Sequence, residues 1–268
     1  LLASPSVRYV LRGEGEVSLP LLAESLRDHR PVADIPGIAF RRADGGLHVN
    51  PPAAMASPDR FPQPALDRVD RSRYLRNGRG SAVVVASRGC PLRCSYCSVG
   101  GSPWLPYRLR PVPQVAAEIE TAVVRHGVGV IDFEDENLSL DRGWFLELLQ
   151  EIRQRFGERA LELRAMNGLF PPTLDESVVA AMAGAGFKAL NLSLGSTHAE
   201  QLRRFHRPDV CAAFDRALDL AERHALAAEP DPDRGQHDEP HQQQDEQALA
   251  RLAGAGAKDH AHRLVIDP

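Results

Sequence analysis

The sequence predicts an α/β protein whose parallel strand–helix units form a barrel-like or doubly wound sheet. From residue 81 to residue 225, short apolar segments alternate about four times with segments of helical periodicity. Apolar residues make up 43% and charged residues 25% of the 268 residues, as is ordinary for a soluble globular protein. Together, the alternation and the composition predict one α/β core of moderate size.

Residues 1–30 are predicted to form a single βα unit at the end of an N-terminal α/β domain. We expect a strand at 7–11, a turn at 13–16, and Ser18 as the N-cap of a helix with Leu19, Leu22 and Leu26 on one face. One βα unit cannot bury both of its faces, so we expect that part of this domain is missing upstream of Leu1.

Residues 31–80 are expected to be a connector, because seven prolines interrupt any regular pattern there: Pro31, Pro36, Pro51, Pro52, Pro58, Pro62 and Pro64. A hairpin is predicted within the connector. Its strands are residues 37–42 and 47–50, and its turn is at 44–46.

Residues 81–225 are predicted to contain four βα units. The strands are expected at 82–86, 128–133, 161–165 and 188–194. The helices are expected at 112–126, 141–156, 174–183 and 210–225.

The character of the chain changes at residues 226–268. Residues 229–247 contain no Ala, Val, Ile, Leu, Met, Phe, Trp, Tyr or Cys, so we expect this tail to be disordered. Two interpretations are open: a natural polar tail, or an end that is read in the wrong frame. We favour the second, because a barrel that stops after four units leaves an apolar strand edge exposed.

Three cysteines follow the first of these strands, at Cys90, Cys94 and Cys97. The C-x3-C-x2-C spacing lets a short loop direct three thiolates at one iron–sulfur cluster. Three ligands leave one metal position open, as in catalytic metal sites. A structural zinc site is the alternative, but it requires a fourth ligand, and Cys211 is expected to be a small buried residue of a distant helix.

The cysteine run, with Tyr96 directly before the third cysteine, resembles the cluster-binding signature of the radical SAM superfamily. The resemblance implies that the cysteines hold a [4Fe-4S] cluster whose open iron is chelated by S-adenosylmethionine (SAM). It further implies reductive cleavage of SAM to methionine and a 5'-deoxyadenosyl radical. In fold, it implies a partial TIM-type barrel of six βα units, of which residues 81–225 resemble the first four.

The resemblance also implies residues that bind SAM, although it assigns no catalytic residue. Asp135 and Glu136 follow the second strand, in a run that resembles the Asp-Asp/Glu-Asn segment of cobalamin-type members. Either carboxylate is expected to accept hydrogen bonds from the ammonium group of SAM, the alternative being an acidic cluster at a helix N-terminus.

Three further residues are candidates for contact with the nucleoside of SAM. Ser193 and Ser196 end the fourth strand, where Ser196 either binds the ribose or belongs to an ordinary turn. Gly195 stands where related proteins often carry a glutamate. Tyr96 is expected either to pack near the adenine or to anchor the cysteine loop.

Cobalamin is a further cofactor implied by the resemblance, because the Gly-Glu-Gly-Glu turn at 13–16 resembles the end of a cobalamin-binding domain. The implied partners are a small-molecule substrate and a reductant such as flavodoxin or ferredoxin. The rival functions are a non-catalytic iron–sulfur or zinc protein and a tRNA methylthiotransferase-like enzyme.

Charge and cysteine content bear on partners and location. A net charge of −4 gives no reason to expect binding to nucleic acid. No run of apolar residues is long enough to span a membrane. Four cysteines, three of them clustered, suit a reducing compartment, so the expected location is the cytoplasm.

Overall fold

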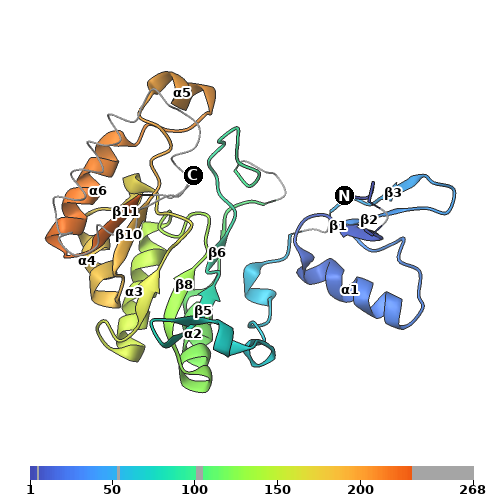
Figure 1. Cartoon of the computed structure of the whole chain (residues 1–268), viewed down its shortest axis with the longest axis horizontal. Coiled ribbons are helices and arrows are strands. Elements are labelled where there is room, and N and C mark those ends of the chain that lie inside the picture. The colour runs from blue at the N-terminus through green and yellow to red at the C-terminus, as the bar shows by residue number, and fades with distance from the viewer. Residues whose placement is uncertain (5, 53–54, 101–104, 231–268) are drawn as a thin grey trace, which may run out of the picture. The chain divides into compact units, whose positions relative to one another are not determined.

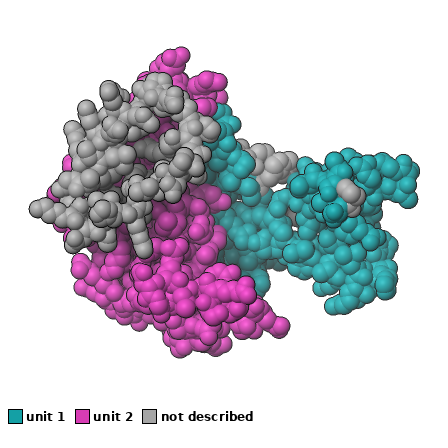
Figure 2. Space-filling model, in the orientation of Figure 1, with its two compact units in different colours: residues 1–64, 87–111 teal, residues 65–86, 112–268 magenta. Residues whose placement is uncertain are grey.

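The computed structural model (Figure 1) describes residues 1–4, 6–52, 55–100 and 105–230. The chain divides into two units, which Figure 2 shows in separate colours. Unit 1 contains residues 1–64 and 87–111, and unit 2 contains residues 65–86 and 112–268, described as far as Pro230.

A parallel sheet forms the centre of unit 2. Strand β5 (Arg79–Val84) pairs with β8 (Val128–Phe133), and β8 pairs with β9 (Glu162–Arg164), all in parallel. The short strand β4 (Leu75–Arg76) adds to β5 in the antiparallel sense at the sheet edge. The second strand is found at the predicted residues, whereas the first begins and ends earlier than the predicted range of 82–86.

Two further parallel strands continue this arrangement. β10 (Ala189–Leu192) pairs in parallel with β11 (Ala227–Pro230). Isolated parallel bridges connect the β9 and β10 regions, Leu163 to Phe187 and Leu169 to Leu192. The sheet does not close among the described residues, which agrees with the expected partial barrel.

Helices connect the strands of unit 2 and pack one against the next, α2 on α3, α3 on α4 and α4 on α6 (Figure 1). Their bounds are Val112–His126 for α2, Arg142–Phe156 for α3, Glu176–Ala185 for α4 and Cys211–Arg223 for α6. The bounds of α2 are those predicted. A short helix, α5 (Ala199–Arg204), was not expected from the sequence.

The core of unit 2 lies between the sheet and these helices. Ile131 and Phe133 of β8 belong to it, together with Phe145 of α3 and Phe187 before β10. Successive side chains of a strand point to opposite faces, so Asp132 lies on the other face of the sheet. We call that other face the inner face.

Unit 1 begins with an antiparallel sheet rather than an isolated βα unit. β1 (Tyr9–Leu11) pairs with β2 (Ile38–Arg41), which pairs with β3 (Leu47–Val49). The predicted hairpin is confirmed, but it shares a sheet with the first strand, across the boundary expected after residue 30. Leu22 of the first helix packs with Ile35 and Ile38 in a small core.

The first helix differs from the prediction in its start and in its buried face. α1 spans Gly15–Arg27 with Glu14 at the N-cap position, so Ser18 as N-cap is wrong. Ser18 is buried within the helix, where its hydroxyl donates to the Pro36 carbonyl at 2.7 Å. Leu19 and Leu26 are 57% and 45% exposed, because the buried face carries the small residues Ser18 and Ser25 beside Leu22.

The rest of unit 1 includes the two short strands that enclose the cysteine loop, β6 (Ser87–Arg88) and β7 (Arg108–Leu109), which pair in the antiparallel sense. Short 3-10 helices occur in both units, at Pro58–Arg60, Leu66–Arg68, Arg71–Arg73 and Pro171–Thr173.

Strand β11 corrects the expectation for the tail after residue 225. It begins at Ala227, so the predicted polar segment starts with a fifth parallel strand beside β10. Residues 231–268, where disorder was expected, lie outside the described residues. None of the helices in the described part of the chain has the length and apolar character needed to cross a bilayer.

Candidate cofactor site

The cysteine loop runs between β6 and β7, and its described residues form tight local turns. The backbone N–H of Cys97 donates to the Cys94 carbonyl at 3.0 Å, and that of Gly100 donates to the Cys97 sulfur at 3.3 Å. Cys94 is buried, Cys90 is partly buried and Cys97 is exposed, and none of the three forms a disulfide. Backbone N–H groups that donate to cysteine sulfur are one of the means by which proteins tune iron–sulfur clusters.

Gly89 shapes the entry to this loop. Its φ is +79°, a conformation that glycine adopts without strain. A Cβ at this position would overlap the carbonyl oxygens of Leu105 and Pro106. Glycine directly before Cys90 therefore lets the outgoing and returning parts of the loop approach closely.

The donor set suits an iron–sulfur cluster, because three cysteines that form no disulfide lie within eight residues of one loop. Within the described ranges, no three Cys, His, Asp or Glu side chains form a group that could hold a metal ion, and the three cysteines are no exception. That Cys90, Cys94 and Cys97 hold a cluster stays a prediction.

Asp135 and Glu136 follow β8 but lie in different environments. Asp135 is 2% exposed, and its Oδ2 accepts a hydrogen bond from the backbone N–H of Ala86 at 3.2 Å. Glu136 is exposed. The N-cap of α3 is Asp141, whose Oδ1 accepts from the Trp144 N–H at 3.0 Å. Neither Asp135 nor Glu136 serves as the helix cap.

Ser193 and Ser196 follow β10, and both hydroxyls have partners within the protein. The Ser193 hydroxyl accepts from Nη2 of Arg207 at 2.7 Å. The Ser196 hydroxyl donates to the Gln201 side chain and accepts from the His198 N–H at 3.0 Å. Ser196 thus organises the turn before α5, which was one of its two predicted roles.

The predicted residues are divided between the two units. Tyr96, which is 57% exposed, and the three cysteines belong to unit 1. Asp135 and Glu136 belong to unit 2, as do both serines, and there they follow the carboxyl ends of two parallel strands. In βα barrels, such strand ends are where ligands bind.

Sequence reasoning missed Asp132, a buried carboxyl on the inner face. It is 5% exposed and its Oδ1 has no hydrogen-bond partner, while its Oδ2 lies 3.9 Å from Nη2 of Arg76. Burial, and next the charge of Glu134, raise the pKa of Asp132 above its usual value. The signal was present in the sequence as an acidic residue within an apolar strand.

Strand register places Asp132 beside Val83 of β5 and Arg164 of β9. Arg164 in turn forms an ion pair with Glu162, Nε to Oε1 at 2.8 Å. The inner face therefore carries charged side chains next to the strand ends, an arrangement able to bind a polar ligand.

Comparisons with known proteins identify the family of this segment. The family model described as the radical SAM superfamily matches residues 84–226, more than half of the chain and including the cysteine loop. An anaerobic magnesium-protoporphyrin IX monomethyl ester cyclase from Synechocystis is 31% identical over 153 residues, covering 57% of this chain and 30% of that protein. This chain thus spans less than a third of that relative.

Two solved structures show the same fold. One is the radical S-adenosylmethionine methyltransferase TsrM from Kitasatospora setae, with tryptophan and a SAM analogue bound. Its TM-score is 0.68 at 22% identity, over 84% of this chain and 45% of that chain. The other is the cobalamin-dependent SAM radical enzyme OxsB with aqua-cobalamin and SAM bound, with a TM-score of 0.67 at 18% identity, over 83% of this chain and 32% of that chain.

Proposed function

Because the chain belongs to the radical SAM superfamily, we propose that it holds a [4Fe-4S] cluster through Cys90, Cys94 and Cys97 and uses it with SAM. The observation that carries the proposal is the loop of three cysteines, none of them in a disulfide, inside the matched segment, residues 84–226. When bound, the reduced cluster supplies the electron that cleaves SAM to methionine and a 5'-deoxyadenosyl radical.

The cysteine loop supplies three thiolates and leaves the fourth iron to SAM. The N–H of Gly100 stabilises negative charge on the Cys97 sulfur through its hydrogen bond. In this proposal the ring of Tyr96, which is 57% exposed, packs against the adenine.

The strand ends of unit 2 supply polar contacts to SAM in this proposal. Glu136 is the exposed carboxylate of the two, and Asp135 is the buried one, which accepts from the Ala86 N–H. Ser193 and Ser196 would reach the ribose through hydroxyl oxygens that also hold their own loop.

For the reaction of the whole protein we propose cobalamin-dependent methyl transfer or a related radical reaction on a small molecule. Support comes from the relatives, which include a methyltransferase, a cyclase and a cobalamin-dependent enzyme. We also propose an external reductant such as flavodoxin or ferredoxin, and a cytoplasmic location, which suits four free thiols.

Anaerobic reconstitution tests the proposed function. We expect about four irons and four sulfides per chain, and a changed electron paramagnetic resonance (EPR) spectrum of the reduced cluster when SAM is added. Cys94→Ser should lose most of the iron, whereas Cys211→Ser, outside the loop, should retain it. One zinc per chain, or no metal in the oxygen-protected protein, would contradict the proposal and favour the non-catalytic alternative.

A further inference from the structure

Two arginines face each other where the cysteine loop begins and ends. β6 and β7 pair so that Arg88 lies directly opposite Arg108. Cys90 is only two residues beyond Arg88, so this strand pair forms the neck of the loop. Like charges directly opposite each other on paired strands repel, and the neck therefore needs an anion to remain paired.

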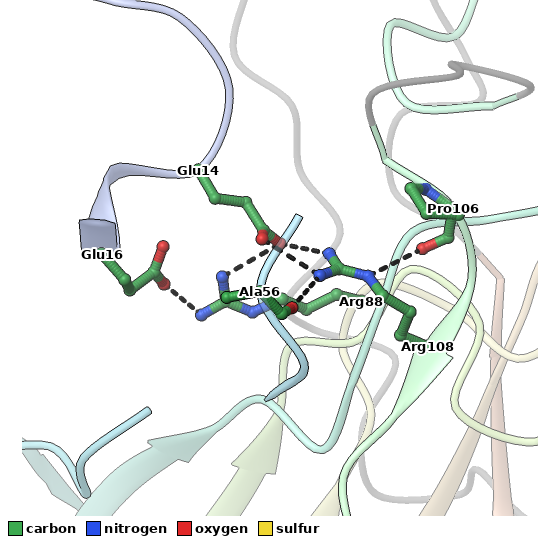
Figure 3. Close-up of polar contacts among 6 residues, drawn as sticks. All are labelled: Glu14, Glu16, Ala56, Arg88, Pro106 and Arg108. Carbon is green, nitrogen blue, oxygen red and sulfur yellow. Dashed lines mark hydrogen bonds and ion pairs between the residues drawn. The ribbon is translucent and has the colours of Figure 1, made fainter. Parts of the chain in front are cut away.

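Glu14 is that anion, and it comes from the start of α1, 74 and 94 residues away in sequence. Figure 3 shows its carboxylate between the two guanidinium groups. Oε1 accepts from Nη1 of Arg88 at 3.2 Å and also from Nη2 of Arg108, while Oε2 accepts from Nη1 of Arg108 at 3.1 Å. The bond to Arg108 is bidentate, the strongest geometry for such a pair.

The contacts are shielded from water and reinforced by neighbours. The side chains of Glu14 and Arg108 are 11% and 15% exposed. Arg108 also donates to the Ala56 carbonyl at 2.7 Å, and the Arg88 guanidinium lies 4.7 Å from the centre of the Phe61 ring. Glu16 forms an ion pair with Arg88, and its side chain is 31% exposed. Among these acidic side chains, Glu14 alone bridges both sides of the neck.

We propose that Glu14 is a positioning residue for the cluster: its carboxylate holds the two ends of the cysteine loop together. This inference rests on the proposed function, because it assigns the loop a cluster to hold. Without the charge on Glu14, Arg108 loses its bidentate carboxylate partner while Arg88 retains Glu16, so the repulsion across the neck is no longer balanced from both sides, and such a loss is costly. The β6–β7 pair then opens, and the described loop residues, 89–100 and 105–107, are no longer confined.

Hydrogen exchange of the full, metal-free chain tests the positioning role first. We expect Glu14→Gln to accelerate amide exchange in residues 87–100 and 105–109, the described parts of the strand pair and loop, on the order of tenfold, the effect of losing a charge-assisted bond. Glu24→Gln is the matched control, because Glu24 lies on the same helix in an exposed ion pair with Arg30 at 3.7 Å. It should exchange like the wild type. If Glu14→Gln fails to fold by circular dichroism, Glu14→Asp keeps the charge but shortens the reach, and an intermediate acceleration is expected.

The cluster provides the second measurement. After reconstitution, Glu14→Gln should retain less iron and show a shifted midpoint potential and EPR spectrum, whereas Glu24→Gln should match the wild type. A purely structural role would lower the yield of folded protein but leave the spectrum of the loaded fraction unchanged, and that result would overturn the inference. Equal loop exchange in Glu14→Gln and the wild type would also overturn it, whatever the iron content. Absence of iron from the wild type would instead contradict the proposed function.

Discussion

The guanidinium of Arg207 fills the space beside Gly195 that a side chain would need. Gly195 has a φ of +87°, and a Cβ there would overlap Nε of Arg207. The same guanidinium donates to the Ser193 hydroxyl at 2.7 Å and to the Leu194 carbonyl at 3.3 Å. The loop after β10 is thus held by an arginine, and glycine at position 195 is what leaves room for it.

We expect Gly195→Ala to destabilise the protein by about 1–3 kcal/mol, because alanine is strained at positive φ and displaces Arg207. Urea unfolding measures the loss. Gly143→Ala near the start of α3 is the control, because the added Cβ would lie 3.6 Å from its nearest neighbour, and the free energy of unfolding should change by less than about 0.5 kcal/mol. An unchanged urea midpoint for Gly195→Ala would show that the loop adapts without strain.

The periodicity of apolar residues correctly predicted those elements in which the apolar side chains are the buried ones. α2 and β8 have the predicted bounds because their apolar periodicity is strong and uninterrupted. α1 did not follow the prediction, because the pairing of β1 with β2 selects which helix face is buried, and that face carries serines. Periodicity reports apolar residues, and it therefore assigned the exposed leucines to the core.

The contacts that organise the candidate site were not predictable for a different reason. Glu14 is hydrogen-bonded to Arg108, which is 94 residues away in the sequence. Arg207 is hydrogen-bonded to Ser193, which is 14 residues away, with a helix between them. No local spacing encodes such pairs. The cysteine triplet, in contrast, is compressed into one loop, so local spacing was enough to predict a cluster site there.

Asp132 should make stability depend on pH. Its pKa is raised in the folded protein by burial first and by Glu134 next. Folding thus favours the protonated form, and the stabilising contribution is complete below the unfolded pKa of about 3.9 and is lost as pH rises through the folded pKa. Asp132→Asn removes this titration. We therefore expect the variant to gain stability relative to the wild type between pH 4 and pH 8.

Urea unfolding at pH 4, 6 and 8 measures this difference. Asp67→Asn, the same change on a side chain that is 69% exposed, is the control for the substitution itself. A constant difference between Asp132→Asn and the wild type across this range would mean that the Asp132 carboxyl does not titrate there in the folded protein.

Asp175 caps α4 and should contribute in the opposite pH direction. Its Oδ1 accepts from the Val178 N–H at 2.9 Å, and hydrogen bonds from Ser177 and then Arg142 lower its pKa to about 2. A lowered pKa stabilises the fold above the unfolded value of about 3.9, and this stabilisation is lost as pH falls through about 2.

At pH 7, Asp175→Ala should cost about 1 kcal/mol in urea unfolding, and no more than that, because half of the side chain is exposed. The cost should shrink toward pH 2. Asp175→Asn retains an N-cap acceptor and should cost only a few tenths of a kcal/mol. Equal losses for the alanine and asparagine variants would point to the ion pair with Arg142 rather than to the cap.

Variants of Asp135 and Glu136 distinguish a structural role from a role in SAM binding. Asp135→Ala leaves the N–H of fully buried Ala86 without this acceptor, a loss of about 1–3 kcal/mol in unfolding free energy. Glu136→Ala removes an exposed side chain and should change stability by less than about 0.5 kcal/mol.

If Glu136 accepts from the ammonium group of SAM, its removal should weaken SAM binding about tenfold or more, the value of a charge-assisted hydrogen bond. Titration of SAM into the reconstituted protein, followed by EPR, measures this loss beside the unfolding data. Normal SAM affinity in Glu136→Ala, together with lost affinity in a folded Asp135→Asn, would assign the contact to the buried carboxylate instead.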